Sequence, residues 1–325
     1  MPKNLMRALK IVVSAGLIAY LIYAVDWSSA VDKLRDANLS LVIVAAVIFM
    51  VNTVATSAWK WRISLRIHGF FNWRLLELGK ILLIGGFMSS FLPTAIGGDI
   101  YRVYRTLPYD GQKSRAVSAV LLDRVTGLLS MFFVGALGAL ALYLQNQDPE
   151  IGFLALALAA PPLLAVAFPY LVGLKLFKPL LEKLAGIRKL EPLMTNARLV
   201  FMNRKGLARL SVVSVLFHIL AVIAIAFLFA AVHTPGALAE SAVADTMYSA
   251  AALIPVSING LGIQEGSFAF TAQQLGISFS HAVIVALMIR IIAVLTSLCG
   301  GIVFFFDKGR TADLTMSPES IEQSD

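Results

Sequence analysis

Six long apolar runs constrain this chain more than any other feature of its sequence. They cover residues 8–25, 39–58, 116–144, 151–177, 210–232 and 281–306. Each run reaches the ~17–25 residues that an α-helix needs to cross the hydrocarbon core of a bilayer. Water is absent from that core, so the backbone must satisfy its own hydrogen bonds, and an α-helix does this within one segment. The sequence therefore predicts an all-α polytopic membrane protein.

The composition excludes the soluble alternatives. Apolar residues make up 58% of the 325 residues and charged residues 14%, with a mean hydropathy of +0.81. A soluble domain has about 25% charged residues, and a disordered chain is less apolar. The sole cysteine, Cys299, excludes a disulfide within the chain. Basic residues precede the first run as in a signal peptide, but no small-residue cleavage site follows it, so we expect a retained helix.

The net charge of +8 is distributed unevenly between the segments that connect the runs. Residues 60–80, 102–115 and 175–209 are strongly basic, whereas 145–150 and 233–245 contain acids and neither Lys nor Arg. The positive-inside rule places the basic segments and both termini in the cytoplasm. This topology accounts for the basic charge, so we expect no nucleic-acid partner. Attraction of residues 175–209 to anionic headgroups is the alternative interpretation of that segment.

Two further apolar stretches, residues 75–102 and 245–274, are interrupted by proline and glycine. Each is predicted to form a short helix, a break and a second short helix. Irregular backbone at membrane depth is tolerated only where it is buried in protein or lines a polar cavity. We therefore expect two re-entrant helical hairpins.

The two interrupted stretches correspond to each other. LPTAIGG in the first break matches IPVSING in the second. An acid and an arginine follow each break at the same spacing of 25 residues: Asp99 and Arg124 after the first, Glu265 and Arg290 after the second. Matching apolar residues occur easily by chance, but matching proline, glycine, acid and arginine do not. The correspondence predicts an internal duplication.

The predicted topology makes the two copies, at about residues 75–145 and 239–307, opposite in direction. If each hairpin returns to its own side, the first enters from the cytoplasm and the second, three crossings later, from outside. Inverted repeats with broken helices near the midplane are a transporter architecture. The predicted fold is thus about six spanning helices and two re-entrant hairpins in one transmembrane domain, residues 1–310, followed by a disordered acidic tail at 311–325.

Charged residues within the predicted spans need partners, because a charge at the centre of a helix in the bilayer costs about 2.5–3.5 kcal/mol. We expect Arg124 to pair with Asp99 and Arg290 with Glu265. Two interpretations of these pairs stay open. They are salt bridges that fix each hairpin to the following helix, or they are part of a substrate site.

The second interpretation uses the half-helix that begins after each break. Free backbone N–H groups at its N-terminus attract an anion such as phosphate, and arginine supplies forked donors to phosphate oxygens. The candidate substrate-binding residues are Pro93, Gly97, Gly98, Asp99, Arg102, Asp123, Arg124, Pro255, Asn259, Gly260, Gly262, Glu265 and Arg290. Four polar residues of other spans either line the route or, more plainly, make interhelical hydrogen bonds: Asn52, Thr53, Ser57 and His218.

Enzyme motifs are lacking in the sequence. It contains no Walker A motif, no H-E-x-x-H, no G-x-S-x-G and no Cys/His cluster. We therefore expect no catalytic residues, no cofactor and no metal. An intramembrane lipid-modifying enzyme that uses Glu265 or Asp99 as a base is the weakest alternative, because no nucleophile accompanies these acids.

Three stretches carry a resemblance to a known family: FLPTAIGGDIYRVYR, AVLLDRVTG and LIPVSINGLGIQEG. They resemble the conserved stretches of the lysylphosphatidylglycerol synthase transmembrane region family, also called flippase-like membrane proteins. The resemblance covers about residues 5–310. The family typically has P-G-G-x-G in the second break, and this chain has Asn259 in place of one glycine. Asparagine tolerates left-handed backbone better than most residues.

The resemblance implies a multi-pass protein of the prokaryotic inner (plasma) membrane whose partner is a lipid, either a phospholipid, a polyprenyl-linked lipid or a hopanoid. Multidomain members carry a soluble aminoacyltransferase, which we do not expect here because the chain ends soon after its last apolar run. We predict transbilayer movement of an anionic or glycosylated lipid by alternating access. The alternative is a non-transporting, lipid-binding or scaffold subunit that partners a membrane-bound transferase.

Overall fold

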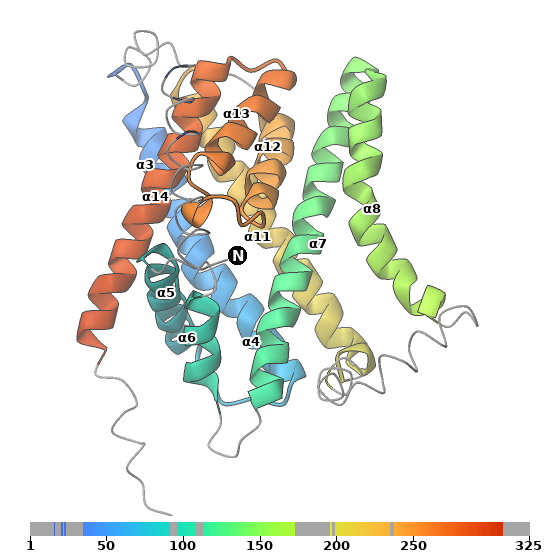
Figure 1. The fold of residues 1–325 in the computed structure, drawn as a ribbon, viewed down its shortest axis with the longest axis vertical. Coiled ribbons are helices and arrows are strands. Elements are labelled where there is room, and N and C mark those ends of the chain that lie inside the picture. The colour runs from blue at the N-terminus through green and yellow to red at the C-terminus, as the bar shows by residue number, and fades with distance from the viewer. Residues whose placement is uncertain are drawn as a thin grey trace, which may run out of the picture.

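The computed structural model describes residues 35–91, 97–107, 113–172, 199–234 and 237–307, together with the single residues 16, 21, 23 and 196. Over these ranges the secondary structure is helical and contains no strand (Figure 1). The predicted all-α class is therefore confirmed. Most of the predicted first span, residues 175–195, the 311–325 tail and Pro93 lie outside the described residues.

The described part of the chain contains five helices that are long and apolar enough to cross a membrane, and they match the last five predicted runs. The cytoplasmic placement of both termini stays a prediction. The helices are α3 (Leu39–Val51), α4 (Ser57–Ile67), α5 (Leu75–Phe91), α6 (Gly97–Thr106), α7 (Lys113–Asn146), α8 (Pro149–Val172), α11 (Arg204–Ala231), α12 (Leu238–Ala251), α13 (Ile263–Gln274) and α14 (Phe279–Phe306).

One span is longer than predicted. A π-helical turn, Asn52–Thr56, joins α3 to α4, and the resulting span reaches Ile67 where the apolar run suggested an end at residue 58. The sequence from Ser57 to Ile67 contains no glycine or proline that would end a helix. Basic residues of this stretch, which we assigned to a connecting segment, therefore lie on α4.

Asparagine begins two of the long helices. The Asn38 side-chain oxygen accepts hydrogen bonds from the backbone N–H groups of Ser40, at 3.1 Å, and Leu41, at 3.4 Å. The Asn203 side chain accepts one from Gly206 at 3.0 Å. Asparagine is among the preferred N-cap residues because its side chain satisfies N–H groups that have no partner within the helix.

The two interrupted stretches form the helix pairs α5–α6 and α12–α13, and the members of each pair pack together. Figure 1 shows the first pair in the lower half of the molecule and the second in the upper half. α7 begins at the lower end and α14 at the upper end, so these two long helices run in opposite directions (Figure 1). This is the arrangement that an inverted repeat requires. A common origin of the two halves stays a prediction.

The second break uses left-handed backbone. Asn259 has φ +50°, Gly260 has φ +73° and Gly262 has φ +80°. Glycine adopts such angles without steric cost, and asparagine adopts them more readily than most other residues. The asparagine that replaces a family glycine is thus compatible with the backbone conformation at this point.

The first helix of each hairpin packs on the long helix of the other half: α12 on α7 and α5 on α14. Glycine permits both contacts. A Cβ on Gly300 of α14 would overlap the backbone carbonyl oxygen of Leu83 in α5. A Cβ on Gly138 of α7 would lie 2.7 Å from the Cβ of Ala242 and 2.8 Å from the backbone oxygen of Ala239 in α12. The helix backbones are therefore in close contact at both crossings.

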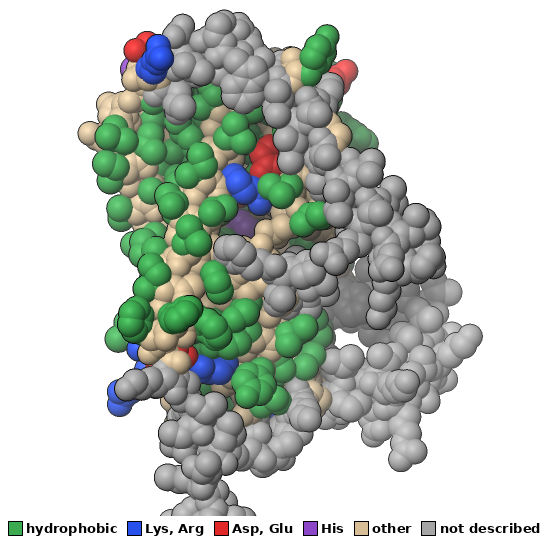
Figure 2. Space-filling model, turned by 60° about the vertical axis from the view of Figure 1, so that its left-hand side comes forward, with side chains coloured by type: hydrophobic (Ala, Val, Ile, Leu, Met, Phe, Trp, Pro, Cys, Tyr) green, Lys and Arg blue, Asp and Glu red, His purple; other side chains and the backbone are tan. Residues whose placement is uncertain are grey.

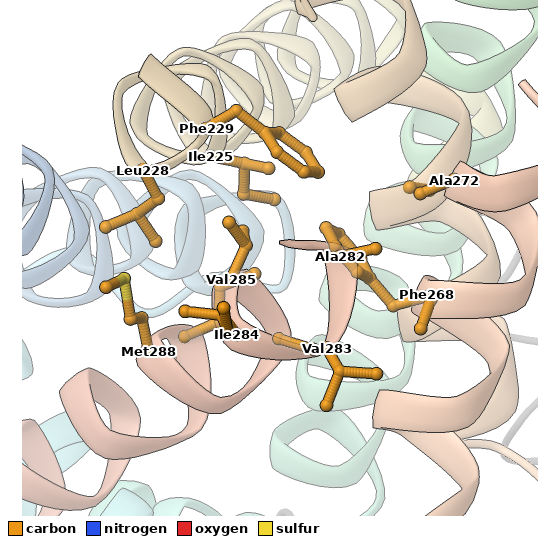
Figure 3. Close-up of a cluster of buried hydrophobic side chains, with 14 of the residues drawn as sticks. Ile225, Leu228, Phe229, Phe268, Ala272, Ala282, Val283, Ile284, Val285 and Met288 are labelled. Atoms are coloured by element: carbon orange, nitrogen blue, oxygen red, sulfur yellow. The ribbon is translucent and has the colours of Figure 1, made fainter. Parts of the chain in front are cut away.

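The largest apolar cluster joins the second hairpin to α11 and α14 (Figure 3). Its centre is a stacked pair of buried rings, Phe229 of α11 and Phe268 of α13, with centroids 5.8 Å apart. Val285 and Met288 of α14 close the cluster from another side (Figure 3). Dense packing of this kind fixes the position of α13, which is too short to cross the bilayer.

The Gly300 crossing makes a testable prediction. The substitution Gly300→Ala should destabilise the fold by about 1–3 kcal/mol, because the added methyl group meets backbone atoms that cannot rotate away. Gly86→Ala on α5 is the matched control, since a Cβ there has no neighbour within 4 Å. It should leave stability unchanged or raise it by up to about 1 kcal/mol through higher helix propensity. Thermal unfolding of the purified proteins in detergent measures both, and equal melting temperatures for the two variants would contradict the close contact.

Candidate functional site

The predicted ion pair of the first hairpin is present. Asp99 lies in the first turn of α6, and Arg124 of α7 donates two hydrogen bonds to its carboxylate. Nε lies 3.0 Å from Oδ2, and Nη2 lies 3.0 Å from Oδ1. A guanidinium that contacts both oxygens of a carboxylate fixes orientation as well as distance. This pair therefore attaches α6 to the helix that follows it.

Further charges join this pair in an arrangement that the sequence did not predict. Nη2 of Arg102 lies 2.7 Å from Oδ2 of Asp123, and Nη1 lies 3.4 Å from Oδ1 of Asp99. Nζ of Lys60 lies 3.4 Å from Oδ1 of Asp123. The Arg102 guanidinium also covers the ring of Trp61, 4.5 Å from its centroid. Together with the Asp99–Arg124 pair, these residues form what we call the first charge cluster.

The first charge cluster has a net charge of +1 over the described residues, from Lys60, Arg102 and Arg124 against Asp99 and Asp123. Lys60, Arg102 and Asp123 are buried. A buried charge must be paired and hydrogen bonded to be tolerated. An excess of one positive charge makes the cluster electrostatically suited to an anion.

Lys60 and Trp61 are the residues of this cluster that sequence reasoning missed. Lys60 was assigned to a basic connecting segment, but it lies on α4 inside the protein. The available signal was the absence of a turn residue between the apolar run and Lys60. When a helix continues beyond an apolar run, a lysine on that continuation can be buried and then needs an acidic partner. Asp123 is this partner of Lys60.

The predicted ion pair of the second hairpin is also present. Nε of Arg290 lies 2.5 Å from Oε1 of Glu265 in the first turn of α13. Nη2 donates to the side-chain oxygen of Gln264 at 2.6 Å, and Nη1 donates to the backbone oxygen of Asn259 at 3.4 Å. All three nitrogens of this arginine thus have acceptors within its own half. We call these residues the second charge cluster.

At each break, one of the N–H groups expected to be free has an acceptor within the chain. The backbone N–H of Gly98 donates to the Ser89 hydroxyl at 2.9 Å. The N–H of Gly262 donates to Oε2 of Glu265 at 2.8 Å. A Cβ on Gly98 would lie 2.5 Å from the backbone oxygen of Gly85. Glycine is therefore needed there to bring α5 and α6 together.

The two clusters occupy equivalent depths but differ in exposure. Arg124 is the twelfth residue of α7, and Arg290 is the twelfth residue of α14. Each therefore lies about 17 Å from the start of its helix, a distance of about half the thickness of a hydrocarbon core, which is about 30 Å. The Arg124 side chain is 60% exposed, whereas that of Arg290 is 18% exposed. Figure 2 shows basic, acidic and histidine side chains on one face, partway between its two ends and among apolar side chains.

The other polar residues of the spans mainly connect helices. The Asn52 side-chain amide donates to the Phe217 backbone oxygen at 2.8 Å, and Nε2 of His218 lies 3.1 Å from the Gly127 backbone oxygen. The Ser57 hydroxyl reaches only the Asn52 backbone oxygen, at 3.5 Å. Interhelical hydrogen bonding is thus confirmed for Asn52 and His218. Within the described ranges, no group of three His, Cys, Asp or Glu side chains is positioned to hold a metal ion.

The family comparison covers both charge clusters. The family described as "Lysylphosphatidylglycerol synthase TM region" matches residues 7–301. This chain belongs to that family. The match extends over most of the sequence and includes both hairpins, all of α7 and most of α14. The comparison with curated proteins gives no match. Family membership and five apolar helices identify a multi-pass membrane protein with a function related to membrane lipids.

The burial of Asp123 makes a second testable prediction. Asp123→Asn should destabilise the protein by about 3–5 kcal/mol, because it leaves Lys60 buried without a counter-charge and leaves Arg102 with only its longer contact to Asp99. Asp148→Asn, the same change at an exposed position between α7 and α8, should stay within about 0.5 kcal/mol of the wild type. Unfolding in detergent, followed by intrinsic fluorescence, measures the difference. A melting temperature for Asp123→Asn equal to that of Asp148→Asn would show that the first charge cluster does not stabilise the fold.

Proposed function

We propose that this protein moves a membrane lipid with a phosphate-bearing headgroup between the two leaflets by alternating access, in the inner (plasma) membrane of a prokaryote. Phosphate is the feature shared by anionic phospholipids and polyprenyl-linked glycolipids, two of the three lipid classes that the resemblance suggests. The protein acts as a transporter, without catalytic residues or a cofactor. Family membership supports a role connected with lipids, and the charge clusters support movement of the headgroup.

The observation that carries this proposal is that the Arg124 side chain is exposed and has hydrogen-bond donors without an acceptor among the described residues. Its Nε and one N–H of Nη2 bind Asp99, and the side chain is 60% exposed near mid-depth. Arginine has five N–H donors, so three remain without an acceptor among the described residues. A guanidinium with free donors, in a cluster of net charge +1, is suited to bind phosphate oxygens through two hydrogen bonds.

The surroundings of Arg124 suit the rest of a lipid molecule. Leu121 and Val125, on the same helix, are about half exposed. A headgroup bound by Arg124 would therefore have apolar side chains beside it, against which acyl or prenyl chains can stay in the hydrocarbon phase. The headgroup would be shielded from hydrocarbon by the charge cluster, which lowers the cost of moving a polar group across the membrane.

The contrast between the two charge clusters supports alternating access. The Arg124 side chain is mostly exposed, which we call the open state. The Arg290 side chain is mostly buried and donates to acceptors of its own half, which we call the enclosed state. In inverted-repeat transporters, the site opens to one side or the other when one half moves against the other. We infer that exchange of the open and enclosed states between the halves presents the headgroup to alternate leaflets.

Lipid movement in proteoliposomes tests the proposal. Vesicles containing the protein should move fluorescently tail-labelled phosphatidylglycerol faster than protein-free vesicles, as measured by loss of dye to dithionite added outside. Arg124→Gln should slow the initial rate about tenfold or more, corresponding to about 1.4 kcal/mol of lost headgroup binding in the transition state. Arg124→Lys should recover only part of the rate, because lysine lacks the planar fork.

Arg105→Gln serves as the matched control, because Arg105 pairs with Asp307, at 2.8 Å, outside the two charge clusters. It should move phosphatidylglycerol at the wild-type rate. An unaltered rate in Arg124→Gln would contradict the assignment of Arg124. No movement by the wild-type protein would contradict transport itself and favour a lipid-binding or scaffold subunit.

A further inference from the structure

A second polar site lies between the two halves, where α11 meets both. Nε2 of His218 on α11 lies 3.1 Å from the backbone oxygen of Gly127 on α7. Its Nδ1 lies 3.8 Å from Oδ2 of Asp245 on α12. The His218 and Asp245 side chains are only 10% and 12% exposed. One histidine thus contacts the long helix of the first half and the hairpin of the second.

The hydrogen bonding of His218 fixes which nitrogen carries a proton. A backbone carbonyl only accepts, so the nitrogen that faces Gly127 must donate, and Nε2 carries the hydrogen. In the neutral ring, Nδ1 is then an unprotonated acceptor. Nδ1 is buried and has no hydrogen-bond partner within the described residues. It faces the carboxylate of Asp245, which is also an acceptor when ionised.

Two acceptors that face each other inside a protein are unfavourable, and one additional proton removes the conflict. If it binds Nδ1, the pair becomes an imidazolium that faces a carboxylate. If it binds the carboxylate, the acid becomes a donor to Nδ1. The pair is therefore a site for one proton, whichever of the two groups binds it.

The charged and titratable groups on the surrounding helices include two ion pairs. On the helices packed against α11, the other such side chains that are buried or partly buried are Lys60 and Arg62 of α4, Arg115, Asp123 and Tyr143 of α7, Glu240 and Tyr248 of α12, and His281, Arg290 and Cys299 of α14. Lys60 pairs with Asp123, and Arg290 pairs with Glu265. α3 and the π-helical turn contribute no titratable side chain, and α11 has none after Arg209 apart from His218. Asp245 is thus the acid that faces His218.

We propose that His218 and Asp245 form a proton-binding site that couples proton movement to the alternation of the two halves. The inference rests on the transport function proposed above. A proton taken up from water on one side forms the Nδ1–H···Oδ2 contact and draws α12 toward α11. Its release to the other side removes that contact. A ligand shifts a conformational equilibrium when it binds the two states with different affinity, and here the proton is that ligand.

Lipid movement under an imposed pH gradient tests the coupling. In proteoliposomes with tail-labelled phosphatidylglycerol, the wild-type rate should change about fivefold or more when a pH gradient replaces symmetric pH. His218→Gln keeps an amide N–H that can donate to the Gly127 carbonyl but does not titrate. Asp245→Asn removes the carboxylate. Both variants should still move lipid at symmetric pH, with a response to the gradient below about twofold.

His233→Gln is the matched control, because Nε2 of His233 also contacts a backbone carbonyl, that of Asp36 at 3.0 Å, in an exposed position. Its response to the gradient should equal that of the wild type. A full response in His218→Gln overturns the inference. A wild-type protein that moves lipid without responding to the gradient also overturns it but leaves the proposed function intact, whereas a wild-type protein that moves no lipid overturns the proposed function.

Ring ¹⁵N NMR of the four histidines in detergent supplies a readout independent of transport. The signal that disappears in His218→Gln identifies His218. It should show the Nε2–H form at high pH, protonation at Nδ1 on acidification, and a displaced titration in Asp245→Asn. An Nδ1–H neutral form, or a titration that Asp245→Asn leaves unchanged, overturns the assignment.

Discussion

The ion pairs between each hairpin and the long helix that follows it are the interactions on which the rest of the structure depends. A hairpin that turns back within the bilayer exposes polar backbone groups. Such a hairpin does not span the bilayer, so the length of its helices alone does not fix its position. An arginine near the middle of a spanning helix is equally unstable without a counter-charge. Asp99–Arg124 and Glu265–Arg290 resolve both problems together, because each pair joins a hairpin to its helix. The first turns of α6 and α13 are thus tied to the arginines of α7 and α14.

Glycine gives the two halves their second connection. Gly135 and Gly301 each lie eleven residues after the arginine of their half, and each contacts the first helix of the opposite hairpin, at Thr246 and Phe87. A Cβ at either position would overlap these side chains. Each hairpin is therefore bound by charge to its own half and by close packing to the other. Movement of one hairpin must displace the long helix of the opposite half, as alternation between two states requires.

Much of this arrangement could be predicted from the sequence, because spacing along a helix determines depth. The spans, the two breaks and the acid–arginine pairs all follow from positions in the chain. The pairing of Arg102 and Lys60 with Asp123 does not, because it depends on the direction in which α4 crosses α6 and α7. For the same reason, nothing in the sequence brings His218 of α11 to Asp245 of α12. To predict contacts between helices that are distant in the chain, one must know the angles at which these helices pack. The periodicity of the sequence does not determine those angles.

Equivalent residues in different surroundings are the feature that most directly connects this fold with movement. Arg124 and Arg290 have the same place in their halves, yet one has unused donors and the other has all three nitrogens bonded. Under the proposed alternating access, the two halves would exchange these arrangements of the arginine. His218 contacts both halves, because it lies 3.1 Å from the Gly127 backbone oxygen of α7 and 3.8 Å from the Asp245 carboxylate of α12. Under the proposed coupling, a single proton at this position would favour one arrangement over the other without any change in the charge clusters themselves.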